Sequence, residues 1–209
     1  MTITFRPVVL CASVLALAAC TGGEPSSATS HGAPAATTAG QTFTSKAWGF
    51  VISYPADFQA TPGFSHSYLQ NGAWKTYAGP RSKGQPVVAL VLAGSNDVTD
   101  AVLRIGASRD PQSVAACTRP SDAMRPGSLG QAKLDGLRFV TFRAGDAAMS
   151  HYLLVRSYRA VHEGACYALD LLVYGTNPKV YSPPRTPPFT HKEAFARLQT
   201  ALEGFRFIR

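Results

Sequence analysis

The residue pair most suggestive of catalysis is Ser65 beside His66, because a histidine base can activate a serine nucleophile. Nucleophilic serines usually occupy a sharp turn within a Gly-x-Ser-x-Gly motif. Segments 63–67 (GFSHS) and 126–130 (PGSLG) come near that motif but miss its spacing. Neighbouring residues of a strand point to opposite faces, so Ser65 and His66 are not expected to pair. We therefore predict no catalytic residue.

Metal binding requires His, Cys or carboxylate side chains that converge on one point. His66, His151, His162 and His191 are isolated from one another, and the sequence contains neither a His-Glu-x-x-His nor a Cys-x-x-Cys motif. We therefore predict no metal site and no cofactor. A site assembled from distant histidines stays open as part of an alternative hypothesis.

Paired carboxylates for glycoside hydrolysis must lie close together in space. The candidates are few, namely Asp135, Asp146, Glu163 and Asp170. Asp170 stands out because it lies within an apolar segment, where burial would raise the pKa of its carboxyl group. A salt bridge to one of the many arginines is the alternative, and it is the favoured interpretation.

Two of the four cysteines, Cys11 and Cys20, belong to the N-terminal region. The remaining pair, Cys117 and Cys166, indicates a disulfide if the chain is exported to an oxidising compartment. Two buried free thiols are the alternative. The bridge would close a loop of about 50 residues, which would destabilise the unfolded chain by about 4 kcal/mol through lost entropy.

The N-terminus has the pattern of a secretory signal. Arg6 precedes an apolar run over 7–19, which is too short to cross the roughly 30 Å core of a bilayer. Residues 17–20 (LAAC) resemble the bacterial lipobox, which implies cleavage before Cys20 and attachment of acyl chains such as palmitate there. An ordinary signal peptide that ends near a cysteine is the alternative. Thr21 after the anchor resembles the sorting pattern of outer-membrane lipoproteins, so we expect the periplasmic side of that membrane.

Composition sets the domain boundaries. Residues 1–19 form the predicted signal peptide, and residues 20–40 a lipidated cysteine followed by a tether of small and polar residues that cannot fold alone. Residues 41–209 suffice for one globular domain with its own core. Removing Arg6 from the 20 basic residues leaves 19 against 12 acids, a net charge of +7. In the envelope this charge favours an anionic partner, export argues against nucleic acid, and a merely solvated basic surface is the alternative.

Most of the domain has the pattern of strands. Apolar residues alternate with smaller ones over 48–54, and the apolar run 87–92 is typical of a strand covered on both faces. Asn71-Gly72 between 67–70 and 73–77 is a strong hairpin signal. Further strands are predicted at 101–108, 130–134, 137–143, 151–158, 166–174 and 205–208.

Two helices are predicted from their N-terminal signals. Asp110 before a proline predicts a short helix over 111–117. Thr190 and Glu193 form a capping box, which predicts a helix over 191–203.

The two ends of the domain resemble PsbP-like and DcrB-like domains. Segment 48–58 (WGFVISYPADF) shares with them a Gly-Phe, an alternating strand, a Tyr-Pro and a following aromatic residue, and segment 203–207 (EGFRF) is similar to the family's C-terminal end. The resemblance implies a single α+β domain whose central, mostly antiparallel sheet is flanked by a few helices. It also implies a non-enzymatic binding or assembly factor. No ligand or metal residue of the family is matched, and the cysteine pair and a proline-rich loop are departures.

The sequence thus favours a membrane-anchored envelope lipoprotein that binds another envelope component and is not an enzyme. Its expected partners are the membrane, through Cys20, and an envelope protein or an anionic envelope component. Five prolines between residues 175 and 189 predict a stiff surface loop, in which Tyr181 and Arg185 are candidates for partner binding. A plain connector is the alternative reading of that loop. The alternative function is an envelope hydrolase or a metal-dependent enzyme whose site forms from distant His and acid residues.

Overall fold

The computed structural model describes residues 40–66 and 73–208. The predicted signal peptide, Cys20 and the tether up to residue 39 lie outside these ranges, as does the predicted Asn71-Gly72 turn. Within the described ranges, no helix has the length and apolar character needed to cross a membrane.

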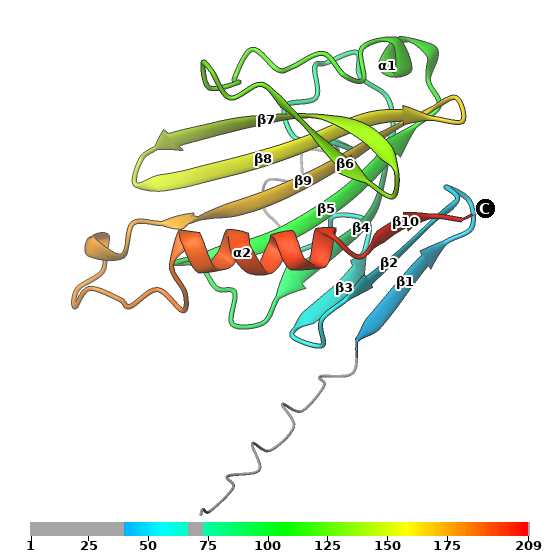
Figure 1. Cartoon of the computed structure of the whole chain (residues 1–209). Helices are drawn as coiled ribbons and strands as arrows, with labels where there is room; N and C mark the ends of the chain where they lie inside the picture. Colours follow the sequence, from blue (N-terminus) through cyan, green and yellow to red (C-terminus); the bar gives the residue numbers. More distant parts are fainter. Residues whose placement is uncertain (1–39, 67–72, 209) are drawn as a thin grey trace, which may run out of the picture. The chain divides into compact units, whose positions relative to one another are not determined.

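A seven-stranded antiparallel sheet forms the centre of the domain (Figure 1). Its spatial order is β3 (Phe58–Pro62), β4 (Gln85–Leu92), β5 (Asp100–Ser108), β9 (Ala165–Thr176), β8 (His151–His162), β7 (Leu137–Ala148) and β6 (Gly130–Leu134). The six predicted strands between residues 87 and 174 are confirmed, and β7, β8 and β9 extend beyond their predicted ends. The long, twisted strands follow from runs of β-branched, aromatic and leucine residues that pack on a pleated surface.

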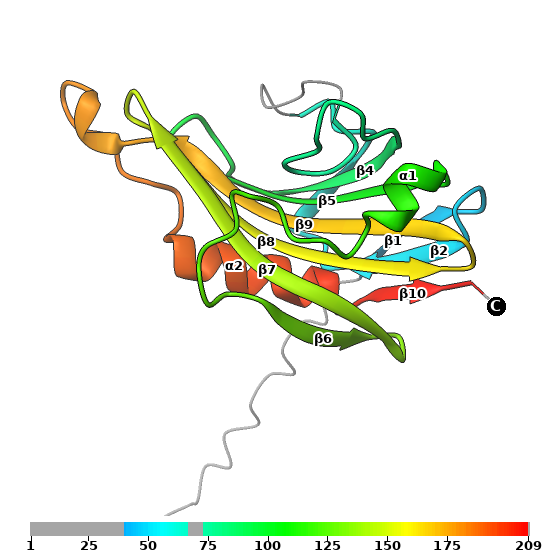
Figure 2. The same ribbon diagram turned by 90° about the horizontal axis from the view of Figure 1, so that it is seen from above.

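A second, three-stranded sheet and a helix cover one face of the large sheet (Figure 2). The small sheet has the order β1 (Gln41–Ser45), β2 (Phe50–Tyr54) and β10 (Phe205–Phe207), all antiparallel. The helix α2 (His191–Leu202) contacts β2, β4, β5 and β9 and leads directly into β10. The predicted α+β class with a mostly antiparallel sheet is thus confirmed.

Alternation along β9 explains how one strand serves two cores. Tyr167, Leu169, Leu171 and Val173 belong to the main core beneath α2 and the small sheet. The intervening Cys166 and Ala168 pack on the other face, which is covered by residues 73–84 and by α1 (Pro111–Ala115). Both faces of β9 are buried, so a polar side chain in this strand needs a partner within the protein.

The predicted strand at 73–77 is wrong. Trp74 is 1% exposed and packs instead beside the Cys117–Cys166 pair on the face of the sheet away from α2. Gly106 of β5 permits this approach, because a Cβ there would come within 1.8 Å of the Trp74 carbonyl oxygen. Tertiary packing of Trp74 therefore overrides the local strand pattern of residues 73–77. The edge strands β1 and β3 were not predicted, and α1 ends two residues before the predicted boundary.

The capping box of α2 forms as predicted and gives a first test of the fold. The Glu193 N–H donates to Thr190 Oγ1 at 3.2 Å, and the Thr190 N–H donates to Glu193 Oε2 at 2.8 Å. Because Thr190→Ala leaves the Glu193 N–H without this acceptor, we expect it to lower the free energy of unfolding by about 1 kcal/mol in urea denaturation. Thr190→Ser keeps the hydroxyl and should retain most of the stability. An equal loss in both variants would contradict the role of the cap.

Candidate functional site

Two arginines face each other across neighbouring strands of the large sheet. Arg143 of β7 lies directly opposite Arg156 of β8 in the antiparallel register. Residues so placed are about 5 Å apart and point to the same face. Within residues 40–66 and 73–208, neither guanidinium forms an ion pair with an acidic side chain. We call Arg143 and Arg156 the arginine rung.

The arginine rung lies on the same face of the sheet as α2. The guanidinium carbon of Arg156 is 4.2 Å from the ring centroid of Phe195 in α2, a cation–π contact. Burial, and then the charge of Arg143, lower the pKa of Arg156, whereas Tyr158 acts in the opposite direction. Like charges directly opposite each other destabilise a sheet. An anion bound at the rung would relieve this repulsion through charge-assisted hydrogen bonds.

Arg125 adds a third guanidinium next to the rung. Its backbone N–H donates to the carbonyl oxygen of Arg143 at 2.8 Å. A Cβ built on Gly145 would lie 2.9 Å from Arg125 Nη2, so the glycine leaves room for this side chain. The Arg125 guanidinium thus lies beside β7, two residues along the strand from Arg143.

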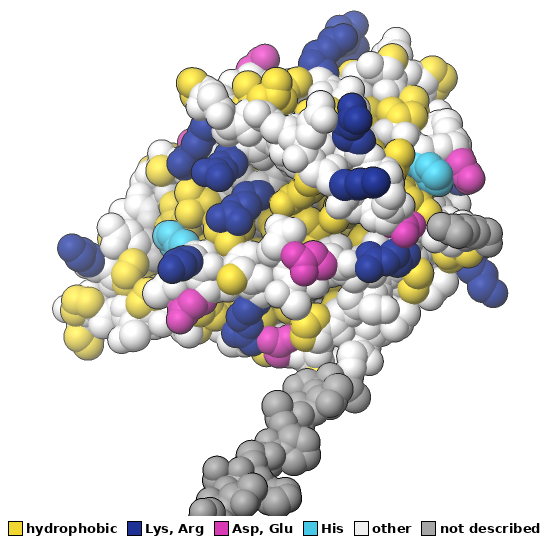
Figure 3. All heavy atoms as spheres, viewed as in Figure 1, with side chains coloured by type: hydrophobic (Ala, Val, Ile, Leu, Met, Phe, Trp, Pro, Cys, Tyr) yellow, Lys and Arg dark blue, Asp and Glu magenta, His cyan; other side chains and the backbone are white. Residues whose placement is uncertain are grey.

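Three long side chains of β8 reach across to α2. Tyr152 lies against His191 with ring centroids 4.8 Å apart, Arg156 stacks on Phe195, and the Tyr158 hydroxyl donates to Gln199 Oε1 at 2.8 Å. The three contacted helix residues are spaced by four and thus form one stripe. In Figure 3 the surface above α2 is hollowed, with hydrophobic side chains inside it and Lys and Arg side chains around it.

A pocket of about 640 Å³ lies where the β7–β8 turn meets the N-terminus of α2. Much of its lining is apolar and comes from Ala147, Ala148, Met149, Tyr152, Pro178 and Pro187. His191 also lines it, and burial lowers the pKa of this imidazole. The volume is in the range of small-molecule sites, and such sites combine apolar walls with a few polar groups.

Histidine and acid residues converge at a second pocket of about 390 Å³, which is lined in part by His66, His151, Asp97 and Asp100. His66 Nε2 lies 2.8 Å from Asp100 Oδ2. This is the feature that would favour the alternative enzymatic hypothesis. Ser65 does not join it, because its hydroxyl donates to the carbonyl oxygen of Pro62 at 3.4 Å. Nor do three or more His, Cys, Asp or Glu side chains of the described residues form a group that could hold a metal ion.

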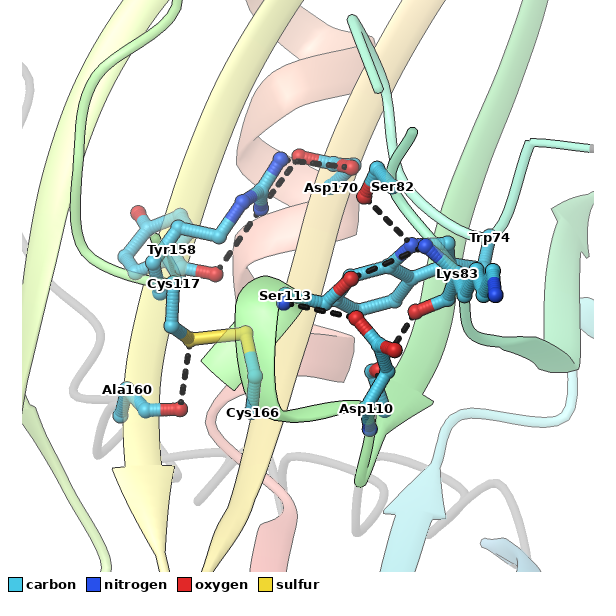
Figure 4. The surroundings of a disulfide bond; sticks show 12 residues. Trp74, Ser82, Lys83, Asp110, Ser113, Cys117, Tyr158, Ala160, Cys166 and Asp170 are labelled. Atoms are coloured by element: carbon cyan, nitrogen blue, oxygen red, sulfur yellow. Dashed lines mark hydrogen bonds and ion pairs between the residues drawn. A yellow bond between two sulfur atoms is a disulfide. The ribbon is translucent and has the colours of Figure 1, made fainter. Parts of the chain in front are cut away.

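Cys117 and Cys166 form a disulfide on the face of the sheet away from α2, with Cα atoms 5.5 Å apart (Figure 4). Asp170 lies further along the same face of β9 and is 1% exposed. The expected salt bridge is confirmed, since Arg159 Nη1 is 2.7 Å from Asp170 Oδ1. The less favoured interpretation, a raised pKa, is wrong. Burial alone would raise the pKa of Asp170, but the Arg159 charge and three hydrogen-bond donors lower it.

The other predicted acidic candidates are used separately in turns and strand ends. Asp135 accepts a hydrogen bond from the Phe207 N–H, Asp146 accepts from the N–H of the next residue, and Glu163 lies beside His162 at the β8–β9 turn. These positions give no paired carboxylate site.

The predicted partner-binding residues Tyr181 and Arg185 lie together but already share an acidic partner. The Tyr181 hydroxyl and Arg185 Nη1 both donate to Asp97 Oδ2, at 2.9 and 2.7 Å. The Arg185 guanidinium carbon is 4.2 Å from the Tyr181 ring centroid. These contacts hold the proline-rich loop to the segment before β5. Cys20, the predicted lipidation site, lies outside the described residues.

No protein-family model matches the chain, and no curated protein matches it. The solved structures similar to it include LpqN, involved in cell envelope biogenesis of Mycobacterium tuberculosis, with 11% identity, a TM-score of 0.44 and coverage of 86% of this chain and 88% of that one. Another is cyanobacterial PsbP (CyanoP) from Synechocystis, with 12% identity, a TM-score of 0.41 and coverage of 84% and 96%. A PsbP structure is thus among those to which the chain is similar. With TM-scores of 0.44 and 0.41, no functional property of these two proteins is assigned to this chain.

Proposed function

We propose that this protein is an envelope lipoprotein that acts as a non-enzymatic binding factor for an anionic envelope component, and that the arginine rung is its binding site. The observation that carries the proposal is the direct opposition of Arg143 and Arg156 without an ion-pair partner in the described part of the chain. A sheet gains nothing in stability from such a pair. Sites that sacrifice stability in this way are common where a ligand supplies the missing charge.

The arginine rung and the proline-rich loop differ in whether their arginines already have an acidic partner. Tyr181 and Arg185 are already bound to Asp97, so a partner there would have to displace an internal acid. Arg143 is exposed, and Arg156 is half-buried against Phe195. A ligand anion at the rung would meet two guanidiniums that match phosphate or carboxylate geometry.

The proposed location rests on the N-terminal sequence. Residues 17–20 (LAAC) support lipidation at Cys20, and the tether before residue 41 would let the domain reach components near the membrane surface. Thr21 supports retention at the outer membrane. We propose that the anchor keeps the rung close to other envelope components, where an effective concentration in the millimolar range permits modest affinities.

The proposal predicts that Arg143→Gln combined with Arg156→Gln lowers binding of the envelope component at least tenfold. Each lost charge-assisted hydrogen bond costs about 1.5–3 kcal/mol, and 1.4 kcal/mol corresponds to a factor of ten. The measurement is chemical crosslinking in intact envelopes with the anchored full chain, followed by mass spectrometry of the captured lipids and proteins. Binding by the native protein should also weaken as salt is raised.

A variant with the same loss of charge provides the control. Arg81→Gln with Arg119→Gln removes two exposed arginines away from the rung and should leave capture unchanged. His66→Ala should likewise leave it unchanged, since the proposal assigns no role to the second pocket. Equal losses in the rung variant and the charge-matched control would contradict a specific site. Loss of capture in His66→Ala with the fold intact would favour the enzymatic alternative.

A further inference from the structure

We propose that the ligand of the arginine rung is an amphiphile with a phosphate head, whose apolar chain lies along β7 and β8 and ends in the pocket beside Met149. The inference rests on the proposed function, because it names the ligand class of the same site. It follows from the path that joins the rung to the pocket.

Three successive pairs of the β7–β8 ladder form this path. Arg143 faces Arg156, Gly145 faces Leu154, and Ala147 faces Tyr152. Alternate residues of a strand share a face, so all three pairs lie on the side of α2. With a rise of about 3.3 Å per residue, the first and third pairs are about 13 Å apart. The third pair belongs to the lining of the 640 Å³ pocket, so the arginines and the pocket share one continuous surface.

Between the arginines and the pocket the path is apolar along Leu154, which is half-buried and packs on the main core. Gly145 has no side chain of its own, and the Arg125 guanidinium lies beside it at the end of the path nearest the rung. Asp146, the acid within this stretch of β7, points to the opposite face of the sheet by alternation. Met149 at the pocket is 91% exposed, an unusual position for a large apolar side chain. An alkyl chain would cover these groups and remove apolar surface from water.

The head of the ligand is assigned from the chemistry of the cations. Guanidinium groups bind phosphate through two parallel hydrogen bonds, and Arg125 beside Gly145 places a third within the same region. A phosphate can accept from several donors at once, and its charge offsets the repulsion between Arg143 and Arg156. A neutral head would leave that repulsion in place.

The test is calorimetric titration of the full chain with octyl, decyl and dodecyl phosphate below their micelle-forming concentrations. We expect the affinity to rise about fourfold per added methylene until the pocket is filled. The Arg143→Gln, Arg156→Gln variant should lose at least tenfold at every chain length. Ala147→Gln, which introduces a polar side chain at the pocket, should reduce the dependence on chain length while retaining the dependence on the arginines.

Each outcome decides the proposal. An affinity that does not change with chain length would overturn the amphiphile, although an anionic ligand and the proposed function would stand. Equal affinity for dodecyl maltoside, which has the same chain and a neutral head, would overturn the phosphate head. Binding of alkyl phosphates that is unchanged in the arginine variant would overturn the site, provided that the unfolding curve of the variant shows an intact fold. The capture experiment in envelopes is independent of all three.

Discussion

Replacing Cys117 and Cys166 together with alanine is expected to lower the free energy of unfolding by about 4 kcal/mol. The bond joins residues 49 apart in the sequence, and cutting it frees the unfolded chain to adopt many more conformations. The sulfurs also pack against Trp74 and Ala168 in a small buried cluster. Their removal therefore weakens the contact that holds residues 73–84 to the sheet.

The measurement is urea denaturation followed by the fluorescence of the two buried tryptophans, Trp48 and Trp74. Reduction of the native protein with dithiothreitol should produce most of the same loss, while the alanine variant should not respond to the reductant. Reduction that shifts the unfolding free energy by less than about 1 kcal/mol would contradict a stabilising disulfide. Proteolysis within 73–84 should also become faster, because this segment would open more often.

The sheet and α2 could be predicted because their signals are local. Alternation marked β2, the apolar run marked β4, and the capping box fixed the start of α2. β1 was not predicted because Gln41–Ser45 is largely polar and exposed and shows no apolar alternation. Its strand conformation comes from backbone pairing with β2. The strand predicted at 73–77 is absent because Trp74 packs against Gly106 of β5 instead, a tertiary contact that the local pattern does not reveal.

The candidate site could not be predicted for a related reason. In the sequence Arg143 ends one predicted strand and Arg156 lies within the next, and arginines in such places are ordinary surface residues. Only the register of β7 against β8 brings them face to face. The spacing of Arg143 and Arg156 did contain a signal. If a short turn joins β7 and β8, residues that lie the same number of positions before and after that turn pair with each other. Placing that turn at Met149 and Ser150, both with positive φ, required the structure.

Replacing Asp170 with asparagine is expected to lower the free energy of unfolding by about 3–5 kcal/mol at neutral pH. Its carboxylate is directly opposite Arg104 on β5 and bound to Arg159 on β8. Ser157 Oγ donates to it at 2.6 Å and the Thr76 N–H at 2.9 Å. Both arginines are buried, and Arg104 Nε and Nη2 have no hydrogen-bond partner in the described structure. Removing this negative charge leaves Arg159 without its ion-pair partner and removes one of the acids whose charge acts on Arg104.

The effect should depend on pH in a defined direction. The Arg159 charge and the hydrogen bonds keep the pKa of Asp170 in the folded protein below its usual value of 3.8, although burial alone would raise it. The unfolded state therefore takes up a proton first as the pH falls. The stability advantage of the native protein over Asp170→Asn should be constant above about pH 5 and should shrink as the pH drops below about 4. An advantage that grew with acidification would show that the pKa is raised.

A double replacement distinguishes two contributions to the free energy of unfolding: the loss from leaving Arg159 unpaired, and the net contribution of the Asp170–Arg159 ion pair. Asp170→Leu with Arg159→Met removes both charges and keeps apolar volume, so we expect it to recover much of the stability lost in Asp170→Asn. Recovery should be incomplete, because Arg104 would still lose the Asp170 charge that acts on it and Ser157 would lose its acceptor. Urea denaturation of the three proteins at pH 7 gives the comparison. If the double variant were less stable than Asp170→Asn, the ion pair would contribute net stability rather than only avoid an unpaired buried charge.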